Sequence, residues 1–369
     1  MQVSSIRVAL VAAFLFFSVS QTSAQDGIAE LIETAGLNDG PVAMRDIGGW
    51  DASRTILVRG SREGWSWLED QFADVSFVYA ATPGEAMDSA PDAGAIIGFC
   101  DNELLANAPA VTWVQIHSAG ADRCLASEQL FRDNLVLTNM QKMSSPVIAE
   151  HAIAMILTLA RKLPTFADSM DEGAWHRDRR YTDGMTTVDG KTMLVIGLGG
   201  IGTEIARRGA ALGMRVVATR NSSRSGPEFV DYVGLTGEML DLAKDADVIV
   251  NALPLTDDTR GLLGDDFFAV EFASPPYFIN VGRGATVDTE ALLEALQAGR
   301  IAGAGLDVTD PEPLPSDHAL WRQPNVIITP HVSARGGDRR RHNLVIAENL
   351  RRYLAGDALL NVVDPQRGY

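Results

Sequence analysis

The 369-residue chain has only two cysteines, Cys100 and Cys124. Two cysteines exclude a disulfide-rich scaffold and a zinc site built from several cysteines. We expect two buried thiols, with a single disulfide between them as the alternative, and we expect no metal site. The chain also lacks low-complexity tracts, and 46% of its residues are hydrophobic, which is typical of a folded protein rather than a disordered one.

Positive charge is scarce, because 31 Lys and Arg face 48 Asp and Glu, a formal net charge of −17. Such a charge repels the phosphate backbone of nucleic acids, so we expect no nucleic-acid partner. Two short basic runs, 177–180 and 339–341, are expected to be solvated faces.

Long hydrophobic runs are also lacking. The apolar run Val8–Val19 follows Arg7 and is succeeded by small residues that end at Ala24. It is well short of the ~20 apolar residues that span a bilayer, and the pattern is typical of a secretory signal peptide. We expect cleavage after Ala24, export to the periplasm or the medium, and no stable membrane insertion after the leader is removed. The alternatives are a membrane anchor, or a true start at Met44 and a cytoplasmic protein.

From about residue 54 onward, strand-like runs alternate with helix-like segments. This alternation indicates βαβ units and parallel sheets, and hence an α/β fold. The predicted strands are Thr55–Val58, Ser76–Tyr79, Ala95–Gly98, Thr112–His117, Val136–Thr138, Thr192–Ile196, Arg215–Thr219, Val248–Ala252, Tyr277–Val281, Gly303–Asp307 and Val326–Thr329.

Two chain crossings separate these strands into two predicted domains. A helix with Ser145 as its cap and Pro146 in its first turn begins the first crossing. The second falls near His331–Gly337, after which a predicted helix, Arg340–Leu354, returns to the first domain. The predicted division is a signal peptide (1–24), an N-terminal extension (25–53), a discontinuous substrate domain (54–145 and 335–369) and a dinucleotide-binding domain (146–334).

A glycine-rich loop follows the strand Thr192–Ile196 and leads into a predicted helix, Thr203–Leu212. In this context a GxGxxG pattern predicts a dinucleotide site: the first glycine makes the turn, the second lets the backbone approach the pyrophosphate, and the third lets the helix pack on the strand. Free N–H groups at the helix start would bind the phosphates. The predicted contacts are Gly197, Gly199, Gly200, Ile201 and Gly202; the alternative is a glycine-rich turn without a ligand.

The end of the second strand of this domain distinguishes the two nicotinamide cofactors. An acidic residue at that position binds the ribose hydroxyls of NAD, but here Arg220 occupies it and Arg224 follows. Guanidinium groups and small polar side chains bind a 2′-phosphate by charge-assisted hydrogen bonds. We therefore predict NADP(H), with NAD(H) possible, bound by Arg220, Asn221, Ser222 and Arg224. The alternatives are that both arginines are exposed surface charges, or that Arg220 stacks on the adenine in an enzyme indifferent to the phosphate.

Three later side chains suit proton and anion chemistry: Arg283, Glu312 and His331. Each follows a predicted strand. Because parallel strands end at one edge of a sheet, we expect the three side chains to gather there, where α/β proteins bind ligands.

Six segments carry a family resemblance from about residue 55 to residue 363. The chain resembles the D-isomer-specific 2-hydroxyacid dehydrogenases, and in particular their glyoxylate/hydroxypyruvate reductase branch. The resemblance implies two Rossmann-like domains, with doubly wound parallel sheets and the active site in the cleft between them, and a homodimer. The segments are IAEH (148–151), GLGGIG (197–202), NALPLTDDTRGLL (251–263), INVGRGATVD (279–288), LDVTDPEPLP (306–315) and NVIITPHVSA (325–334).

The same resemblance assigns roles to residues. Arg283 corresponds to the substrate-binding arginine, His331 to the acid/base and Glu312 to its carboxylate partner. Family positions along the cofactor are matched by Leu253, Pro254, Thr259, Val281 and Asp307, and the backbone amides that hold the substrate carboxylate are matched by Ala119 and Gly120.

These roles agree with the chemistry of 2-keto acid reduction. The reaction needs a hydride from the nicotinamide, a proton for the developing alkoxide and a cation for the carboxylate. We expect an NAD(P)-dependent oxidoreductase of a small 2-keto or 2-hydroxy acid. The alternatives are a dehydrogenase of a bulkier D-2-hydroxy acid, which needs more room near Phe99 and Ala119, and a non-catalytic dinucleotide-dependent sensor.

Overall fold

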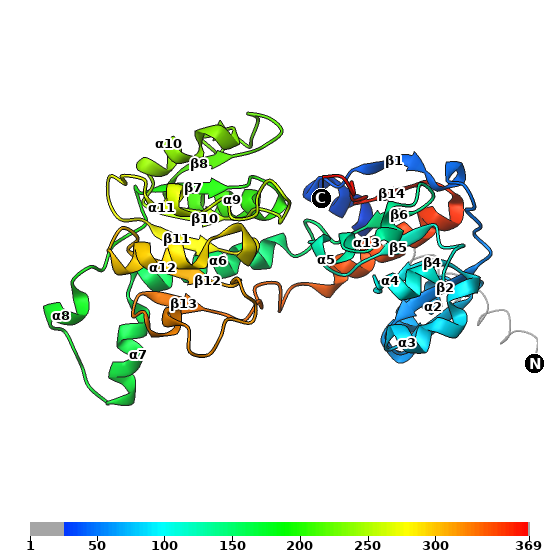
Figure 1. Ribbon diagram of the computed structural model, residues 1–369, viewed down its shortest axis with the longest axis horizontal. Coiled ribbons are helices and arrows are strands. Elements are labelled where there is room, and N and C mark those ends of the chain that lie inside the picture. Colours follow the sequence, from blue (N-terminus) through cyan, green and yellow to red (C-terminus); the bar gives the residue numbers. More distant parts are fainter. Residues whose placement is uncertain (1–25, 368–369) are drawn as a thin grey trace, which may run out of the picture. The chain divides into compact units, whose positions relative to one another are not determined.

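The computed structural model describes residues 26–367, apart from the side chain of Asp168. The predicted signal peptide lies outside the described residues. The chain forms two compact units (Figure 1): unit 1 holds the described residues up to Met143 and from Asp338 onward, and unit 2 is Ser144–Gly337. The domain boundaries predicted at 145/146 and 334/335 lie two and three residues from these.

Unit 2 is built on a seven-stranded parallel sheet with the order β13-β12-β11-β10-β7-β8-β9. The chain starts at the central strand β7, adds β8 and β9 on one side, and then crosses to β10 on the other side of β7. This reversal of strand order creates the switch point at which doubly wound sheets bind ligands. The strands are β7 (Thr192–Ile196), β8 (Arg215–Thr219), β9 (Tyr232–Gly234), β10 (Val248–Asn251), β11 (Tyr277–Asn280), β12 (Gly303–Leu306) and β13 (Val326–Ile328).

Both faces of this sheet are buried, because alternate side chains of each strand point to opposite faces. Met193 and Val195 pack beneath α6 and α9, whereas Leu194 and Ile196 pack beneath α10, α11 and α12. The helices of unit 2 are α6 (Ser145–Ala160), α7 (Leu163–Asp171), α8 (Arg179–Thr182), α9 (Gly200–Ala211), α10 (Met239–Lys244), α11 (Asp265–Phe268) and α12 (Thr289–Gln297).

The helix predicted after the first crossing is α6, and Pro146 lies in its first turn as expected. The predicted cap residue was wrong: Ser145 is already helical, and Ser144 holds the cap position without a side-chain cap hydrogen bond. Proline fits this place because the first helical N–H groups need no intrahelical acceptor.

Unit 1 contains a five-stranded parallel sheet with the order β3-β2-β4-β5-β6 and a separate antiparallel pair, β1 and β14. Its strands are β1 (Asp39–Ala43), β2 (Thr55–Arg59), β3 (Phe77–Ala80), β4 (Ala93–Ile97), β5 (Trp113–Gln115), β6 (Val136–Thr138) and β14 (Ala358–Leu360). Its helices are α2 (Ser66–Gln71), α3 (Pro83–Ala86), α4 (Asn102–Ala106), α5 (Asp122–Leu125) and α13 (Arg339–Ala355).

The segment 26–53 is part of unit 1 and not a separate extension, which corrects the sequence-based division. Residues 26–35 are helical, and Leu31 and Met44 are buried in one cluster with Ile346 and Tyr353 of α13. The apolar side chains of this segment therefore complete the core on one face of the unit 1 sheet.

Short 3-10 helices complete the secondary structure: η1 (Met44–Asp46), η2 (Glu63–Trp65), η3 (Met87–Asp92), η4 (Glu128–Phe131), η5 (Thr236–Glu238), η6 (Gly284–Thr286) and η7 (Ala319–Arg322).

The two cysteines form a disulfide, so the expectation of two thiols was wrong and the alternative is confirmed. Cys100 follows β4 and Cys124 lies in α5, with 5.4 Å between their Cα atoms, within the usual range for a disulfide. Cys124 is buried and Cys100 is half-buried. In the described part of the chain, no helix has the length and apolar character to cross a membrane.

Candidate functional site

The glycine-rich loop of unit 2 joins β7 to α9, and its geometry demands glycine at two positions. Gly197 has a φ of 96°, which disfavours a side chain. A Cβ at Gly202 would lie 2.1 Å from the carbonyl oxygen of Gly197 and 3.0 Å from Cγ1 of Val195. The start of α9 therefore packs directly on the loop and strand. A Cβ at Gly199 would meet nothing within 4 Å, so this part of the loop faces open space.

The first turn of α9 has the donors that a pyrophosphate needs. Gly199 is the cap residue and provides no side-chain acceptor. Within residues 26–367, the N–H groups of Gly200, Ile201 and Gly202 have no acceptor, whereas the next N–H, of Thr203, bonds to Gly199 at 2.9 Å. Unpaired N–H groups at a helix N-terminus bind phosphate oxygens. The loop thus fits a dinucleotide.

The loop after β8 carries the residues predicted to bind the 2′-phosphate. Arg220 is half-buried and its Nη1 donates to the carbonyl of Ser225 at 3.1 Å. Arg224 is exposed and forms an ion pair with Glu238 at 2.7 Å. Asn221 and Ser222 are exposed. Arg220 therefore keeps a guanidinium without a carboxylate partner, while Arg224 must exchange Glu238 for a phosphate if it binds one.

Two buried asparagines, which the sequence reasoning did not single out, shape the ends of β10 and β11. The Nδ2 of Asn251 donates to Oδ1 of Asn280 at 3.0 Å and to the hydroxyl of Thr286 at 2.7 Å. Their side-chain oxygens accept from the N–H groups of Leu253 (3.2 Å) and Gly282 (3.1 Å). The network fixes the loops that carry predicted cofactor contacts. In the sequence, each asparagine is a polar residue at the end of an apolar strand, and this pattern could have indicated such a network.

The predicted contacts near these loops lie as follows. Leu253 and Pro254 follow β10, and the hydroxyl of Thr259 donates to the carbonyl of Pro254 at 2.7 Å, which closes the loop. Val281 is buried directly after β11.

His331 and Glu312 lie together after neighbouring strands of the sheet. The Nδ1 of His331 is 2.7 Å from Oε1 of Glu312, and both side chains are partly exposed. The carboxylate can accept a hydrogen bond from Nδ1–H and stabilise a protonated imidazole, and this arrangement leaves Nε2 available for a substrate.

Asp307 holds the backbone that carries His331. His331 has a φ of 52°, an uncommon conformation for a residue with a side chain. Its N–H donates to the carbonyl of Asp307 at 2.8 Å. The carboxylate of Asp307 accepts from the N–H groups of Val332 (2.9 Å) and Ser333 (3.0 Å) and from the hydroxyl of Thr329 (2.6 Å). Asp307 therefore holds the turn formed by residues 329–333 in place through hydrogen bonds.

The ionisation of Asp307 follows from these contacts. Its side chain is almost fully buried. Burial alone would raise the pKa of the carboxyl, but hydrogen bonds from Ser333, Thr329 and the backbone of Val332 outweigh burial and hold the pKa below its usual value. The group is an anion at neutral pH.

Two further residues near this turn were not assigned a role from sequence. The hydroxyl of Thr329 lies 3.0 Å from Nε2 of His151 on α6, and that nitrogen lies 3.7 Å from Oδ1 of Asp307. The motif that contains His151 was visible in the sequence, but only the fold brings it to the end of β13.

Arg283 lies directly after β11 and precedes η6. Its Nη1 donates to the carbonyl of Gly282 at 2.9 Å, and its own carbonyl accepts from Thr286 at 2.7 Å. A Cβ at Gly284 would lie 1.9 Å from the carbonyl oxygen of Thr309. Glycine here lets the loop of Arg283 contact the loop that leads to Glu312.

The remaining predicted contacts, Ala119 and Gly120, lie in unit 1 between β5 and α5. The carbonyl of Ala119 accepts from Asn139 at 2.7 Å, and that of Gly120 accepts from the hydroxyl of Ser118 at 2.7 Å. Their N–H groups have no acceptor among the described residues. Adjacent N–H groups of this kind bind anions such as a carboxylate.

Aromatic and basic side chains adjoin this loop at the carboxyl ends of β2, β4 and β5. The guanidinium of Arg59 lies 5.8 Å from the ring centre of Phe99, and the rings of Trp65 and His117 are 5.7 Å apart. Desolvation, Arg59 and His342 lower the pKa of His117 to about 4, so the imidazole is neutral at pH 7. Arg59 thus contributes a positive charge to this edge, whereas His117 does not.

The structure thus brings Arg283, Glu312 and His331 to the carboxyl ends of β11, β12 and β13, the edge that also carries the glycine-rich loop. Throughout residues 26–367, no three His, Cys, Asp or Glu side chains are grouped to hold a metal ion.

Residues 153–333 match the family described as "D-isomer specific 2-hydroxyacid dehydrogenase, NAD binding domain". The chain is 34% identical over 270 residues to a glyoxylate reductase of Aeropyrum pernix, which covers 72% of this chain and 79% of that protein.

Solved structures are similar over most of the chain. A D-isomer specific 2-hydroxyacid dehydrogenase of Xanthobacter autotrophicus, in complex with NADPH, is 29% identical, covers 86% of this chain and 100% of that one, and has a TM-score of 0.73. An NADPH-dependent glyoxylate/hydroxypyruvate reductase of Sinorhizobium meliloti, in complex with NADP and sulfate, is 25% identical with the same coverages and a TM-score of 0.74. The chain therefore belongs to the D-isomer specific 2-hydroxyacid dehydrogenases and is an NAD(P)-dependent enzyme that acts on CH–OH donors.

Proposed function

We propose that this enzyme reduces small 2-keto acids, of the glyoxylate and hydroxypyruvate class, and prefers NADPH. The observation that carries the proposal is the 2.7 Å contact between His331 and Glu312 at the sheet edge that also carries the glycine-rich loop. The names of the similar proteins, which include glyoxylate reductase and glyoxylate/hydroxypyruvate reductase, support the substrate class.

Glu312, His331 and Arg283 each have a separate role in the proposed reduction. The bound nicotinamide supplies the hydride. Glu312 accepts a hydrogen bond from Nδ1–H of His331 and orients the protonated imidazole, so that Nε2 donates its proton to the oxygen of the former keto group. The fork of Arg283 binds the carboxylate and the keto oxygen.

The substrate carboxylate also needs hydrogen-bond donors that suit an anion. The N–H groups of Ala119 and Gly120 have this character, since their carbonyls are engaged elsewhere and the N–H groups are not. We assign them to the carboxylate oxygens of the substrate.

The preference for NADPH rests on Arg220. It directly follows β8, at the position where an acidic residue would bind NAD, and among the described residues its guanidinium donates to a neutral carbonyl, that of Ser225. A 2′-phosphate offers it a charge-assisted hydrogen bond that NADH does not. In this assignment Asn221, Ser222 and Arg224 complete the phosphate contacts.

One assay distinguishes this function from the two alternatives, a dehydrogenase of bulkier acids and a non-catalytic sensor. Purified protein lacking residues 1–24 is mixed with NADPH or NADH and with glyoxylate, hydroxypyruvate, pyruvate or bulkier 2-keto acids, and loss of the reduced-nicotinamide absorbance is followed. Turnover with NADPH and the two smallest acids is expected. Turnover with bulky acids alone would indicate the larger-substrate dehydrogenase, and tight NADPH binding without any turnover would indicate a sensor.

We also propose that the protein is exported through its N-terminal signal peptide. The charge and apolar pattern of residues 1–24 supports this, as does the disulfide, because disulfides persist in oxidising compartments. Fractionation of cells that express the full chain, together with N-terminal sequencing, tests it: an N-terminus at Gln25 outside the cytoplasm is expected, and an intact Met1 in the cytoplasm would contradict it.

A homodimer is the oligomeric state that we propose. Leu163 and Met170 of α7 are 52% and 82% exposed, and Trp175, which follows α7, is 90% exposed. In Figure 1, α7 and α8 extend away from the sheet of unit 2. Large exposed apolar side chains on a projecting segment suit an interface with a second copy. Light scattering should give twice the chain mass, and Trp175→Asp should give the monomer mass.

A further inference from the structure

The N–H groups of Ala119 and Gly120, in the loop between β5 and α5 (residues 116–121), have no acceptor among the described residues, whereas the carbonyls of Ser118 and Ala119 are engaged. Met140 donates to the carbonyl of Ser118 at 2.9 Å, and Asn139 donates to that of Ala119 at 2.7 Å. The arrangement of these two N–H groups therefore depends on the position of both ends of the loop, at β5 and at α5. The strand β5 fixes the first end through its pairing with β4 and β6.

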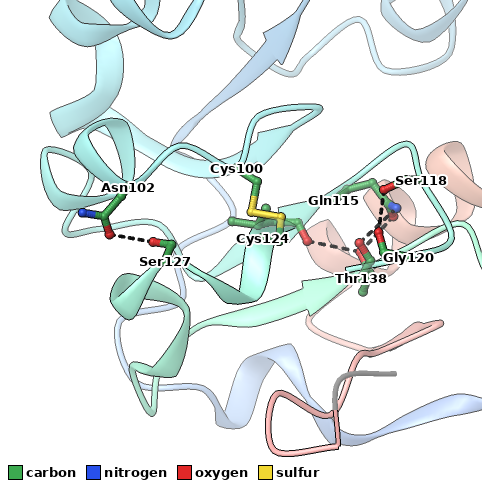
Figure 2. The surroundings of a disulfide bond; sticks show 9 residues. Cys100, Asn102, Gln115, Ser118, Gly120, Cys124, Ser127 and Thr138 are labelled. Carbon is green, nitrogen blue, oxygen red and sulfur yellow. Dashed lines mark hydrogen bonds between the residues drawn. A yellow bond between two sulfur atoms is a disulfide. The ribbon is translucent and has the colours of Figure 1, made fainter. Parts of the chain in front are cut away.

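The second end of the loop is α5, a helix of four residues whose cap residue, Ala121, provides no side-chain hydrogen bond. A helix this short has little stability of its own. Two cross-links hold this segment (Figure 2). The disulfide joins Cys124 of α5 to Cys100 in the loop that follows β4, and a hydrogen bond of 2.8 Å joins Ser127, just beyond α5, to Asn102, the first residue of α4. Only the disulfide is covalent.

Cys124 is four residues beyond Gly120, and its side chain is buried in the core on one face of the unit 1 sheet. Cys100 follows β4, the neighbour of β5. The disulfide thus joins α5 to the loop that follows β4, at the carboxyl edge of one sheet. The segment just before α5 bears the N–H groups assigned to the substrate, and the loop after β4 bears Phe99.

We propose that the disulfide is a positioning device for substrate binding: it holds the N–H groups of Ala119 and Gly120 in the arrangement that binds the carboxylate. The enzyme then reaches full substrate affinity only after Cys100 and Cys124 are oxidised. This inference rests on the proposed function, since that function assigns the two N–H groups to the substrate.

The oxidation is a dithiol–disulfide exchange with a second protein. The two thiols of this chain lose two protons and two electrons and form one S–S bond, while a disulfide of the partner oxidoreductase takes up both and becomes a dithiol. Thiols stay reduced in the cytoplasm, and disulfides form in the periplasm or outside the cell. Export would therefore convert a weakly binding enzyme into a tightly binding one.

The test compares oxidised enzyme, enzyme reduced with a phosphine, and the Cys100→Ser/Cys124→Ser variant, all lacking residues 1–24. Steady-state rates give KM for glyoxylate and kcat with NADPH, and fluorescence titration gives Kd for NADPH, which binds to unit 2. Reduction and the double substitution should each raise KM at least tenfold, with kcat and the NADPH Kd changed less than twofold. The reductant should not change KM of the double variant.

Hydrogen exchange provides a readout that does not need turnover. Amides of residues 116–126 should exchange at least tenfold faster in the reduced enzyme and the double variant, while a peptide covering β7 and α9 should not change. Ser127→Ala, which removes only the hydrogen bond to Asn102, is the matched control and should leave KM within threefold. Unchanged KM and unchanged exchange on reduction would overturn the proposal. Faster exchange in a protein that turns over no keto acid would support the positioning and would reject only the proposed function.

Discussion

The hydroxyl of Thr329 donates a 2.6 Å hydrogen bond to the carboxylate of Asp307. Asp307 directly follows β12, Thr329 directly follows β13, and the same carboxylate accepts from the backbone N–H groups of the two residues after His331. The proposed acid/base is thus held by a buried anion that need not touch the substrate.

Thr329→Val keeps the shape of the side chain but removes this donor. A hydrogen bond to a charged group contributes about 1.5–3 kcal/mol, so we expect the free energy of unfolding in urea to fall by about that much. We also expect kcat to fall roughly tenfold or more, because small displacements of a catalytic group are costly. Thr182→Val is the matched control: its hydroxyl is exposed and contacts only a backbone carbonyl, and both quantities should stay near wild type. Equal effects of the two variants would contradict this role of Thr329.

The pH dependence of stability should report on Asp307. Its pKa is lowered in the folded enzyme relative to about 3.9 in an unfolded chain. A depressed carboxyl pKa stabilises the folded state fully above the unfolded value, and this contribution is lost as the pH falls toward the folded value. The difference in unfolding free energy between wild type and Asp307→Asn should therefore be largest at pH 6–7 and shrink below about pH 4. Urea denaturation at several pH values measures it, and a difference that stays constant down to pH 3 would exclude this contribution.

The cofactor preference should depend on the loop after β8. Removal of both guanidiniums in Arg220→Ala/Arg224→Ala deletes charge-assisted hydrogen bonds of about 1.5–3 kcal/mol each, which predicts a rise in the NADPH Kd of about 10- to 100-fold for each guanidinium that contacts the phosphate. The NADH Kd should change less than twofold. Arg177→Ala/Arg179→Ala, at two exposed arginines of the same unit, removes the same charge and controls for it. An equal rise in the Kd values for NADPH and NADH would show that the arginines do not recognise the 2′-phosphate.

Most of the sheet framework could be predicted because buried parallel strands are continuous apolar runs. All eleven predicted strands are present within two residues of their expected ends, and three of them, Val136–Thr138, Thr192–Ile196 and Arg215–Thr219, match at both ends. The strands that were missed, β1, β9 and β14, are short. Two of them pair only with each other, and the third is the edge strand of its sheet, so no long apolar run marks them.

The side-chain network of the candidate site was harder to predict. Arg283, Glu312 and His331 follow strands and carry obvious chemistry, whereas Asn251, Thr329 and His151 act on other residues of the protein. Their roles depend on contacts across 178 residues in the case of His151 and Thr329, which only the folded chain brings together. The disulfide is similar, because the spacing of two cysteines does not tell whether their Cα atoms come close.

The central claim, that His331 supplies the proton, is tested most directly by the kcat of His331→Gln with NADPH and glyoxylate. A positioned general acid contributes about 10²- to 10⁴-fold in rate, so kcat should fall by that factor while the Kd for NADPH stays within twofold of wild type. A variant that binds NADPH normally and keeps the wild-type kcat would contradict the assignment of His331 and, with it, the mechanism proposed for this enzyme.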